Sequence, residues 1–209
     1  ELTFKRYEKK YLLNDEQYKM LREKTADFMT VDKYGEHTIC NIYYDTEDDE
    51  LIRTSIEKPK YKEKLRLRSY GVPKEDDTVF LEIKKKYDGI VYKRREQIIC
   101  ADAETLIRNG AMIKYDSQIF REIEYFLTVH NVVPKLYLAY DRIAMVGTEQ
   151  PELRITFDKN IRSRRNDLAL TAGDRGEMLL DDGMHLMELK APGVIPLWLA
   201  RILSEMEIY

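Results

Sequence analysis

The sequence predicts an α+β fold built on a large antiparallel β-sheet that is closed or strongly curled. Segments with alternating apolar and polar residues recur along the chain, and short turns or helix-like segments separate them. The 209 residues include only 9 Gly and 6 Pro, which favours long regular elements over irregular loops. Because no linker, repeat or low-complexity segment interrupts the sequence, we expect residues 1–209 to form a single domain.

The first half of the chain predicts helices inserted between strands. Residues 3–12 alternate as a strand does, and Asn14 follows as the N-cap of a helix over about 15–29. Asp88 and Gly89 are a residue pair typical of the turn of a β-hairpin. The other elements expected here are a strand at 39–45, a short helix at 46–56, and strands at 61–70, 79–86 and 90–99.

The second half of the chain continues the alternation of helices and strands. Asp102 is the expected N-cap of a short helix that Gly110 ends, and apolar residues at helical spacing predict a longer helix over 117–130. A last helix begins near Pro196, because proline is favoured in a first turn. Strands are expected at 135–146, 152–158, 161–165 and 184–190.

The charge of the chain is distributed unevenly. The 35 basic and 38 acidic residues give a formal net charge of −3, which excludes a uniformly basic nucleic-acid-binding protein. Residues 60–95 nevertheless contain twelve basic side chains against six acidic ones. Cys40 and Cys100 are too few for a disulfide framework, and no apolar run is long enough for a membrane helix. We therefore expect a cytoplasmic location.

Alternate residues of a strand share a face, and in five predicted strands one such face is rich in basic residues. A solvent-exposed sheet face would explain any single strand, but the repetition over five strands favours a basic channel lined by a closed sheet. The residues that share these faces are Arg6, Glu8 and Lys10; Lys64, Arg66 and Arg68; Glu82, Lys84 and Lys86; Lys93 and Arg95; and Glu188 and Lys190.

Such a channel predicts a chain of phosphates as its ligand. Arginine offers two parallel donors to phosphate oxygens, and lysine offers a compact positive charge. The carboxylates of Glu8, Glu82 and Glu188 lie on the same faces and could hold a divalent cation that bridges phosphates.

These residues occur in motifs that resemble the VTC domain (vacuolar transporter chaperone), a polyphosphate polymerase domain of the CYTH-like triphosphate tunnel superfamily. The resemblance implies an eight-stranded antiparallel β-barrel tunnel with helices packed outside. It also implies binding of ATP or another nucleotide triphosphate with Mn²⁺ or Mg²⁺, and transfer of the γ-phosphate to a growing polyphosphate chain. The motifs are RYEKKYLL (6–13), YYDT (43–46), KLRLRSYG (64–71), FLEIKKK (80–86), VYKRR (91–95), YDR (140–142), LRITFD (153–158) and LMELK (186–190).

The resemblance also assigns roles to individual residues. The nucleophile would be the terminal phosphate of the polyphosphate chain, so no Ser, Cys or His is required. The residues implied to act on the triphosphate are Lys10, Arg66, Arg68, Lys84, Lys93, Arg142 and Arg154. We further expect phosphate binding by Arg6, Lys64, Lys86, Arg95 and Lys190, and metal binding by Glu188 together with Glu8 and Glu82.

Two departures from the family pattern leave alternatives open. Hydrolytic members of the superfamily carry Glu-x-Glu-x-Lys on the first strand, whereas this chain has Arg6-x-Glu8-x-Lys10, which favours a polymerase over a metal-dependent inorganic or nucleoside triphosphatase. Family members also continue into a Ser-Lys segment with another tunnel lysine, whereas this sequence ends at Tyr209. Without that segment we expect a non-catalytic module that binds polyphosphate or nucleotides.

The expected partners follow from the same reasoning. Polyphosphate, pyrophosphate and tripolyphosphate are the expected ligands besides the nucleotide. Nucleic acid is not expected, because the basic faces lack the interleaved exposed aromatic residues that stack on bases. A membrane-protein partner that receives the product, and the oligomeric state, are left open by the sequence.

Overall fold

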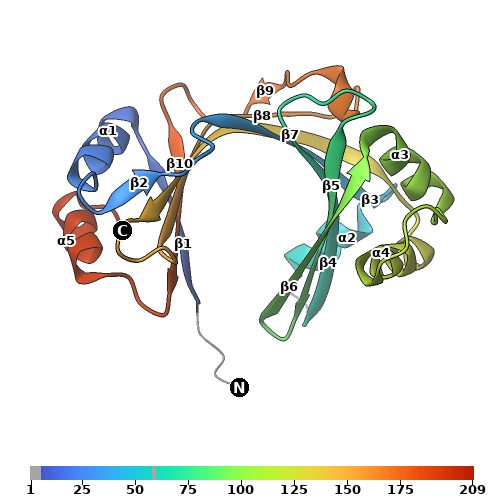
Figure 1. The fold of residues 1–209 in the computed structure, drawn as a ribbon, viewed down its shortest axis with the longest axis horizontal. Coiled ribbons are helices and arrows are strands. Elements are labelled where there is room, and N and C mark those ends of the chain that lie inside the picture. The colour runs from blue at the N-terminus through green and yellow to red at the C-terminus, as the bar shows by residue number, and fades with distance from the viewer. Residues whose placement is uncertain (1–5, 58–59) are drawn as a thin grey trace. The chain divides into compact units, whose positions relative to one another are not determined.

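The computed structural model describes residues 6–57 and 60–209, with Arg6 described by its backbone only (Figure 1). The first residues of the strand expected at 3–12 therefore lie outside the described part. Contacts divide the chain into two compact units, which we describe separately. Unit 1 comprises Glu1–Thr38, Tyr140–Ile161 and Met178–Tyr209, and unit 2 comprises Ile39–Ala139 and Arg162–Glu177. The expectation of a single domain over 1–209 stays a prediction.

Unit 1 is a small antiparallel sheet with two helices. Strand β1 pairs with β10, β10 pairs with β8, and the short strand β2 pairs with the end of β7. Strands β7 and β8 begin or end in unit 2. The elements are β1 (Arg6–Leu13), α1 (Asp15–Lys24), β2 (Met29–Val31), β7 (Val132–Gly147), β8 (Arg154–Arg164), β10 (His185–Pro192) and α5 (Leu197–Glu205).

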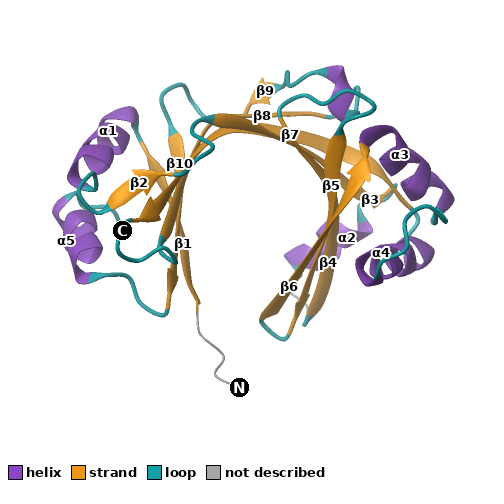
Figure 2. Cartoon of the chain, in the orientation of Figure 1, coloured by secondary structure: helices purple, strands orange, loops and turns teal. Residues whose placement is uncertain are grey.

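Unit 2 is an antiparallel meander with helices on one side, as Figure 2 shows for α3 and α4. Strand β3 pairs with β4, β4 with β5, and β5 with β6. The elements are β3 (His37–Thr46), α2 (Glu50–Ile56), β4 (Tyr61–Tyr70), β5 (Thr78–Tyr87), β6 (Ile90–Ile99), α3 (Cys100–Asn109), α4 (Gln118–Val129) and a 3₁₀ turn at Leu170–Ala172, with β9 (Glu177–Met178) at its boundary.

The hydrophobic core of each unit lies behind the charged face of its strands. In unit 2, Leu65, Leu67 and Leu81 are buried against residues of α3 and α4. In unit 1, Met187 and Leu189 are buried with residues of α5. Because strand side chains alternate between faces, burial of these residues directs their charged neighbours to the opposite face.

Local signals in the sequence explain several element boundaries. Asn14 caps α1 as predicted. Its side chain accepts a hydrogen bond from the Gln17 backbone N–H, and the Asn14 backbone N–H donates to the Gln17 side chain. Asp88 and Gly89 both have positive φ, at 45° and 85°, as a two-residue type I′ hairpin requires. Ser117 caps α4 by accepting from the backbone of Phe120.

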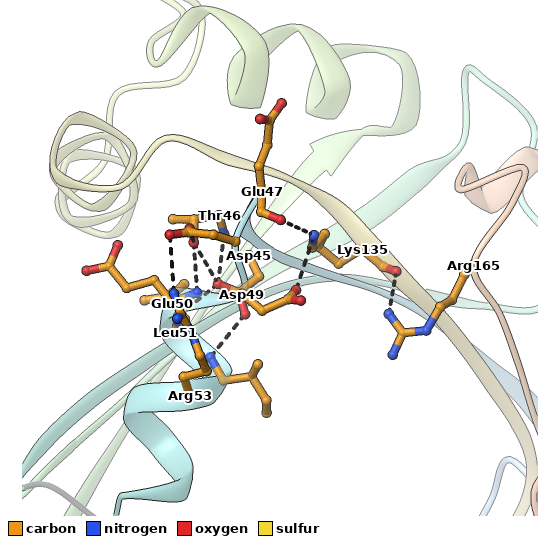
Figure 3. A network of polar contacts seen from close by, with 11 residues as sticks. Asp45, Thr46, Glu47, Asp49, Glu50, Leu51, Arg53, Lys135 and Arg165 are labelled. Carbon is orange, nitrogen blue, oxygen red and sulfur yellow. Dashed lines mark hydrogen bonds and ion pairs between the residues drawn. The ribbon is translucent and has the colours of Figure 1, made fainter.

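The start of α2 is held by a network of polar contacts (Figure 3). The Asp45 carboxylate accepts hydrogen bonds from the backbone of Leu51 and Ile52, which satisfies donors that a first helical turn leaves free. Lys135 of β7 donates to the backbone carbonyl of Glu47 at 2.7 Å and pairs with Asp49 at 3.2 Å. Asp45 therefore caps the helix, and Asp49 anchors its start to Lys135.

Among the boundaries that differ from the prediction are those of α1, β8 and α3, whereas α2 begins at Glu50 instead of residue 46 and β7 at Val132 instead of residue 135. Helix α1 ends at Lys24 because Thr25 closes it and donates its hydroxyl to the Leu21 carbonyl, and Met29–Val31 forms a strand instead. The strands expected at 152–158 and 161–165 are one strand, in which Asn160 takes a φ of 52°. Helix α3 begins at Cys100, before the expected cap at Asp102.

Eight of the strands in the described part of the chain have eight or more residues, and their pairings with known register are antiparallel. This number agrees with the predicted eight-stranded antiparallel fold of α+β class. Among the described residues, no helix combines the length and the apolar character that crossing a bilayer requires.

Candidate functional site

The meander of unit 2 collects most of the predicted phosphate-binding residues on one face. Strand register places them directly opposite one another, so that they form rows across β4, β5 and β6. Arginine rows occupy one end of this face and lysine rows occupy the other. The rows are Arg68 with Phe80; Arg66, Glu82 and Arg95; Lys64, Lys84 and Lys93; and Lys62 with Lys86.

Glu82 lies at the centre of the main arginine row. Its side chain is only 6% exposed, and it accepts from Arg66 Nε at 2.6 Å and lies 3.5 Å from Arg95 Nε. Burial raises the pKa of the Glu82 carboxyl, but the positive charges of Arg66 and other nearby arginines outweigh burial, and the net pKa is lowered. The carboxylate therefore stays ionised and fixes both guanidinium groups.

The other polar contacts of these arginines also restrict their orientation. Arg66 donates to the Tyr43 hydroxyl at 3.3 Å. Arg95 lies 3.6 Å from the centre of the Phe80 ring and donates to the Tyr70 hydroxyl at 2.7 Å. These guanidinium groups are held in place before any ligand binds.

Arg68 is positioned by a neutral partner. It is buried, and its Nε donates to Asn41 Oδ1 at 2.8 Å. The Asn41 amide in turn donates to the Leu138 carbonyl at 3.1 Å, which fixes the orientation of the amide. Since Asn41 carries no charge, this contact orients Arg68 without neutralising it.

The lysine rows place like charges next to one another. Lys64 lies directly opposite Lys84, and Lys84 lies directly opposite Lys93. Directly opposite residues of antiparallel strands have Cβ atoms about 5 Å apart, so that like charges there destabilise the sheet. A bound polyanion would relieve this repulsion.

A second cluster lies in unit 1, on β1, β8 and β10. Register places Glu8 opposite Lys190, and Lys10 opposite Glu188. Lys190 Nζ lies 3.4 Å from the Glu188 carboxylate. Burial raises the pKa of Glu188, but the charges of Lys190 and Lys10 contribute to a net lowering. Two carboxyl groups therefore converge next to two cations.

This carboxyl pair fits a divalent cation that prefers oxygen ligands. Mg²⁺ is usually held by one or two carboxylates, and substrate phosphates and water complete its shell. The described residues contain no group of three or more His, Cys, Asp or Glu side chains that could hold a metal alone. A cation here would thus depend on Glu8, Glu188 and the substrate.

Arg142 and the buried Asp158 form an ion pair in the same unit. The Arg142 guanidinium donates twice to the carboxylate, at 2.7 Å and 2.8 Å, and lies 5.0 Å from the centre of the Tyr140 ring. Burial lowers the pKa of Arg142, but the bonds to Asp158 outweigh it and raise the pKa overall. Arg154 is exposed, opposite Lys190 on β10.

The structure thus collects the predicted residues in two clusters, except for the Arg6 side chain, which lies outside the described part. The sequence assigned no role to the side chains that orient the arginines, which are Asn41, Tyr43, Tyr70, Phe80 and Asp158. Four of them lie within the motifs of the resemblance, and all but Phe80 carry polar atoms. Polar residues on the same strand face as the arginines were the signal that could have identified them.

Solved structures similar to this chain share its fold. A protein from Bacillus halodurans described as a "putative adenylate cyclase" has a TM-score of 0.58 and 14% identity, over 97% of this chain and 89% of that chain. A Hippeastrum protein described as a "putative adenylyl cyclase" with a dominant triphosphatase activity has a TM-score of 0.58 and 15% identity, over 97% and 87%. A comparison with curated proteins gives no significant match.

The fold is that of the CYTH-like triphosphate tunnel proteins, as the antiparallel strands and the structural similarity both indicate. The VTC domain model matches residues 5–209, and the chain therefore belongs to the VTC domain family. Family and fold together identify an enzyme class that handles nucleotides and phosphates.

Proposed function

We propose that the protein is an ATP-dependent polyphosphate polymerase, which transfers the γ-phosphate of the nucleotide to a growing polyphosphate chain. The observation that carries the proposal is the length of the basic face in unit 2. From Lys62 to Arg68 the face extends over seven residues of β4, and the distance between the two ends is roughly 20 Å at the rise of a strand. This is longer than the three phosphates of a nucleotide, which favours a longer chain as the ligand.

The arginines are suited to the chemical step. In phosphoryl transfer the protein acts mainly by positioning and by stabilising charge on the transferred group. Arg66 and Arg95 are held by Glu82, and Arg68 by Asn41, so their donors need little reorganisation when charge develops. We accordingly assign Glu82 to orienting arginines rather than to binding metal. We assign Lys84 and Lys93, together with the arginines, to neutralising the charge of the triphosphate.

The lysines at the other end are suited to holding the chain. Lysine acts as a compact charge on a flexible stem, so it attracts phosphates without demanding one geometry. Lys64 and Lys86 would therefore let a chain shift as it grows. The nucleophile is an oxygen of the terminal phosphate, so no side chain needs to form a covalent intermediate.

In unit 1 we assign metal binding to Glu188 and Glu8, with Mn²⁺ or Mg²⁺ as the cation. When bound, such a cation neutralises phosphate charge and orients phosphate oxygens. Lys10 and Lys190 keep the Glu188 carboxyl ionised and are assigned to phosphate binding. Arg142 and Arg154 are assigned to the same substrate, Arg142 being held in place by Asp158.

The cysteines support a cytoplasmic location, which we include in the proposal. Both are free and buried, and burial with nearby carboxylates raises the pKa of Cys100 to about 11. A thiol with so high a pKa is unreactive, as expected for a residue of a reducing compartment.

A metal-dependent triphosphatase is the second candidate. It is favoured by the carboxyl pair of Glu8 and Glu188, since a metal held there could also orient a water molecule. Against it stands the length of the basic face, which a triphosphate would only partly occupy.

The test is incubation of the purified protein with ATP and Mn²⁺ or Mg²⁺, followed by gel separation with a polyphosphate stain. Long chains with matching ADP release are expected, and orthophosphate alone would replace the proposal with the triphosphatase. Neither product, with tight tripolyphosphate binding, would indicate a binding module. Glu188→Ala should abolish turnover, whereas Arg108→Ala on the exposed end of α3 should not change it.

A further inference from the structure

The β5–β6 hairpin ends in a group of exposed large apolar side chains. Tyr61, Tyr87 and Ile90 lie directly opposite one another across three strands and are 46%, 57% and 50% exposed. Tyr92 shares their face of the sheet and is equally exposed, and Val91 is exposed on the other face. Figure 1 shows the hairpin and the start of β4 ending together in unit 2. We call this group the hairpin tip.

Cations surround the hairpin tip. Lys62 and Lys86 form the row next to the hairpin tip. The backbone carbonyl of Lys60 accepts a hydrogen bond from the Asp88 backbone N–H in the turn. Asp88 is the acidic residue of the turn itself. The Glu63 carboxylate, on the same strand as Tyr61, lies 3.1 Å from His130 Nε2 and 3.9 Å from Lys85 Nζ. The tip therefore combines exposed tyrosine and aliphatic groups with an excess of lysine.

We propose that the hairpin tip docks on an anionic lipid bilayer surface. Tyrosine has an apolar ring and a polar hydroxyl, and such side chains are enriched at the level of lipid headgroups. Ile90 and Val91 at the apex would enter the boundary between headgroups and acyl chains. Lysine stems can lie along apolar surface while their ammonium groups reach anionic headgroups.

The distribution of charge favours an anionic bilayer over a second copy of the chain as the partner of the hairpin tip. Lys62 and Lys86 share a row with Val91, on the face opposite to Tyr61, Tyr87 and Ile90, so a second copy packed on the tyrosine face would not contact these lysines. An anionic bilayer offers both the apolar layer that Ile90 needs and the negative charge that the lysines need. The inference depends on the hairpin alone and does not rest on the proposed polymerase activity.

The experiment is sedimentation of the full chain with vesicles of phosphatidylcholine, alone or mixed with phosphatidylserine, without ATP or metal. We expect binding to the mixed vesicles that weakens with salt, and little binding to phosphatidylcholine alone. The double variant Ile90→Ser/Tyr92→Ser should lower the affinity by about tenfold or more. Ile113→Ser, which removes a fully exposed isoleucine in the α3–α4 loop, is the matched control and should bind as the wild type does.

Circular dichroism and thermal unfolding show whether the variants fold. We expect them to fold, because both substituted residues lie on an exposed part of β6. Absence of binding to mixed vesicles at low salt would overturn the proposal. Equal binding by the double variant and the wild type would do the same. Self-association of the wild type that the double variant lacks, without vesicle binding, would assign the tip to contacts between copies instead.

Discussion

The arginine rows and the lysine rows occupy one face of one meander, yet the structure holds them differently. Arg66 is fixed by Glu82 and Tyr43, and Arg95 by Glu82, Phe80 and Tyr70. Lys64, Lys84 and Lys93 lie directly opposite one another as like charges on flexible stems. We expect the arginine end to provide oriented donors for chemistry, with Lys84 and Lys93 neutralising the triphosphate beside it, and Lys64 and Lys86 to provide adaptable charge for holding a chain.

The largest effect is expected from removing the fork of one fixed arginine. Arg66→Lys keeps the charge but loses the donors that contact Glu82 and Tyr43, and lysine cannot reproduce their geometry. We expect kcat with ATP to fall by about 10²-fold, the loss typical of one oriented donor. Steady-state ADP release measures it, with Arg108→Lys as the control. Turnover equal to that of the wild type would remove Arg66 from the chemical step.

The second effect concerns the carboxylate that holds the arginines. Glu82→Gln leaves Arg66 and Arg95 without their shared counter-charge, and we expect a loss of about 2 kcal/mol in the free energy of unfolding. Denaturant titration measures it, with the exposed Glu104→Gln as the control. A variant as stable as the wild type would mean that the two guanidinium groups do not depend on Glu82.

The same variant gives a prediction about pH. The folded-state pKa of Glu82 lies below its usual value of 4.5, so its stabilising contribution is present above that pH and is lost as the pH falls through the lowered pKa. The difference in unfolding free energy between wild type and Glu82→Gln should therefore be largest near neutral pH and shrink in acid. A difference that grows in acid would contradict the assigned direction of the pKa.

The sequence was sufficient to predict these faces but not the contacts within them. A period of two residues determines that Lys64, Arg66 and Arg68 share a face, whatever the rest of the fold does. That Glu82 meets Arg66 on one side and Arg95 on the other depends on register, which long-range pairing and the hairpin turns set. For this reason the sequence could not reveal that the Glu82 carboxylate pairs with both arginines.

The fold was predictable to a similar extent. Asn14 and the Asp88-Gly89 pair act through local hydrogen bonds and dihedral angles, and both predictions are confirmed. The predicted end of α1 was wrong. Thr25 is fixed by burial and by its hydrogen bond to the Leu21 carbonyl, and both depend on packing rather than on the local sequence pattern. The pairing of Arg142 with Asp158 joins the neighbouring strands β7 and β8 and depends on their register, so it was likewise not predicted.

The lysine rows should show a smaller effect that depends on the length of the ligand. Lys64→Ala should weaken binding of long polyphosphate by about fivefold, the affinity that one exposed ion pair contributes. The number of counterions released on binding, measured from the salt dependence of the affinity, should fall by about one. Tripolyphosphate should be affected less, because a short chain bound by the arginines with Lys84 and Lys93 depends less on Lys64 than a long chain does. Fluorescence or calorimetric titration with the two ligands at several salt concentrations measures both effects. Equal losses for the two ligands would contradict the division between the rows.

The smallest effect is expected at the turn that joins the two arms of the lysine rows. Gly89 has a φ of 85° with no atom near the position of a Cβ, so Gly89→Ala introduces backbone strain of about 1 kcal/mol and no clash. Asp88→Gly should instead be neutral or slightly stabilising, because it relieves the positive φ of a residue with a side chain. Hydrogen exchange of the hairpin amides measures both.

If Gly89→Ala opens the hairpin, polyphosphate affinity should fall while the arginine rows keep their contacts with Glu82, since those contacts lie farther along β5. Loss of turnover together with affinity would show that the two ends of the face are coupled and do not act separately.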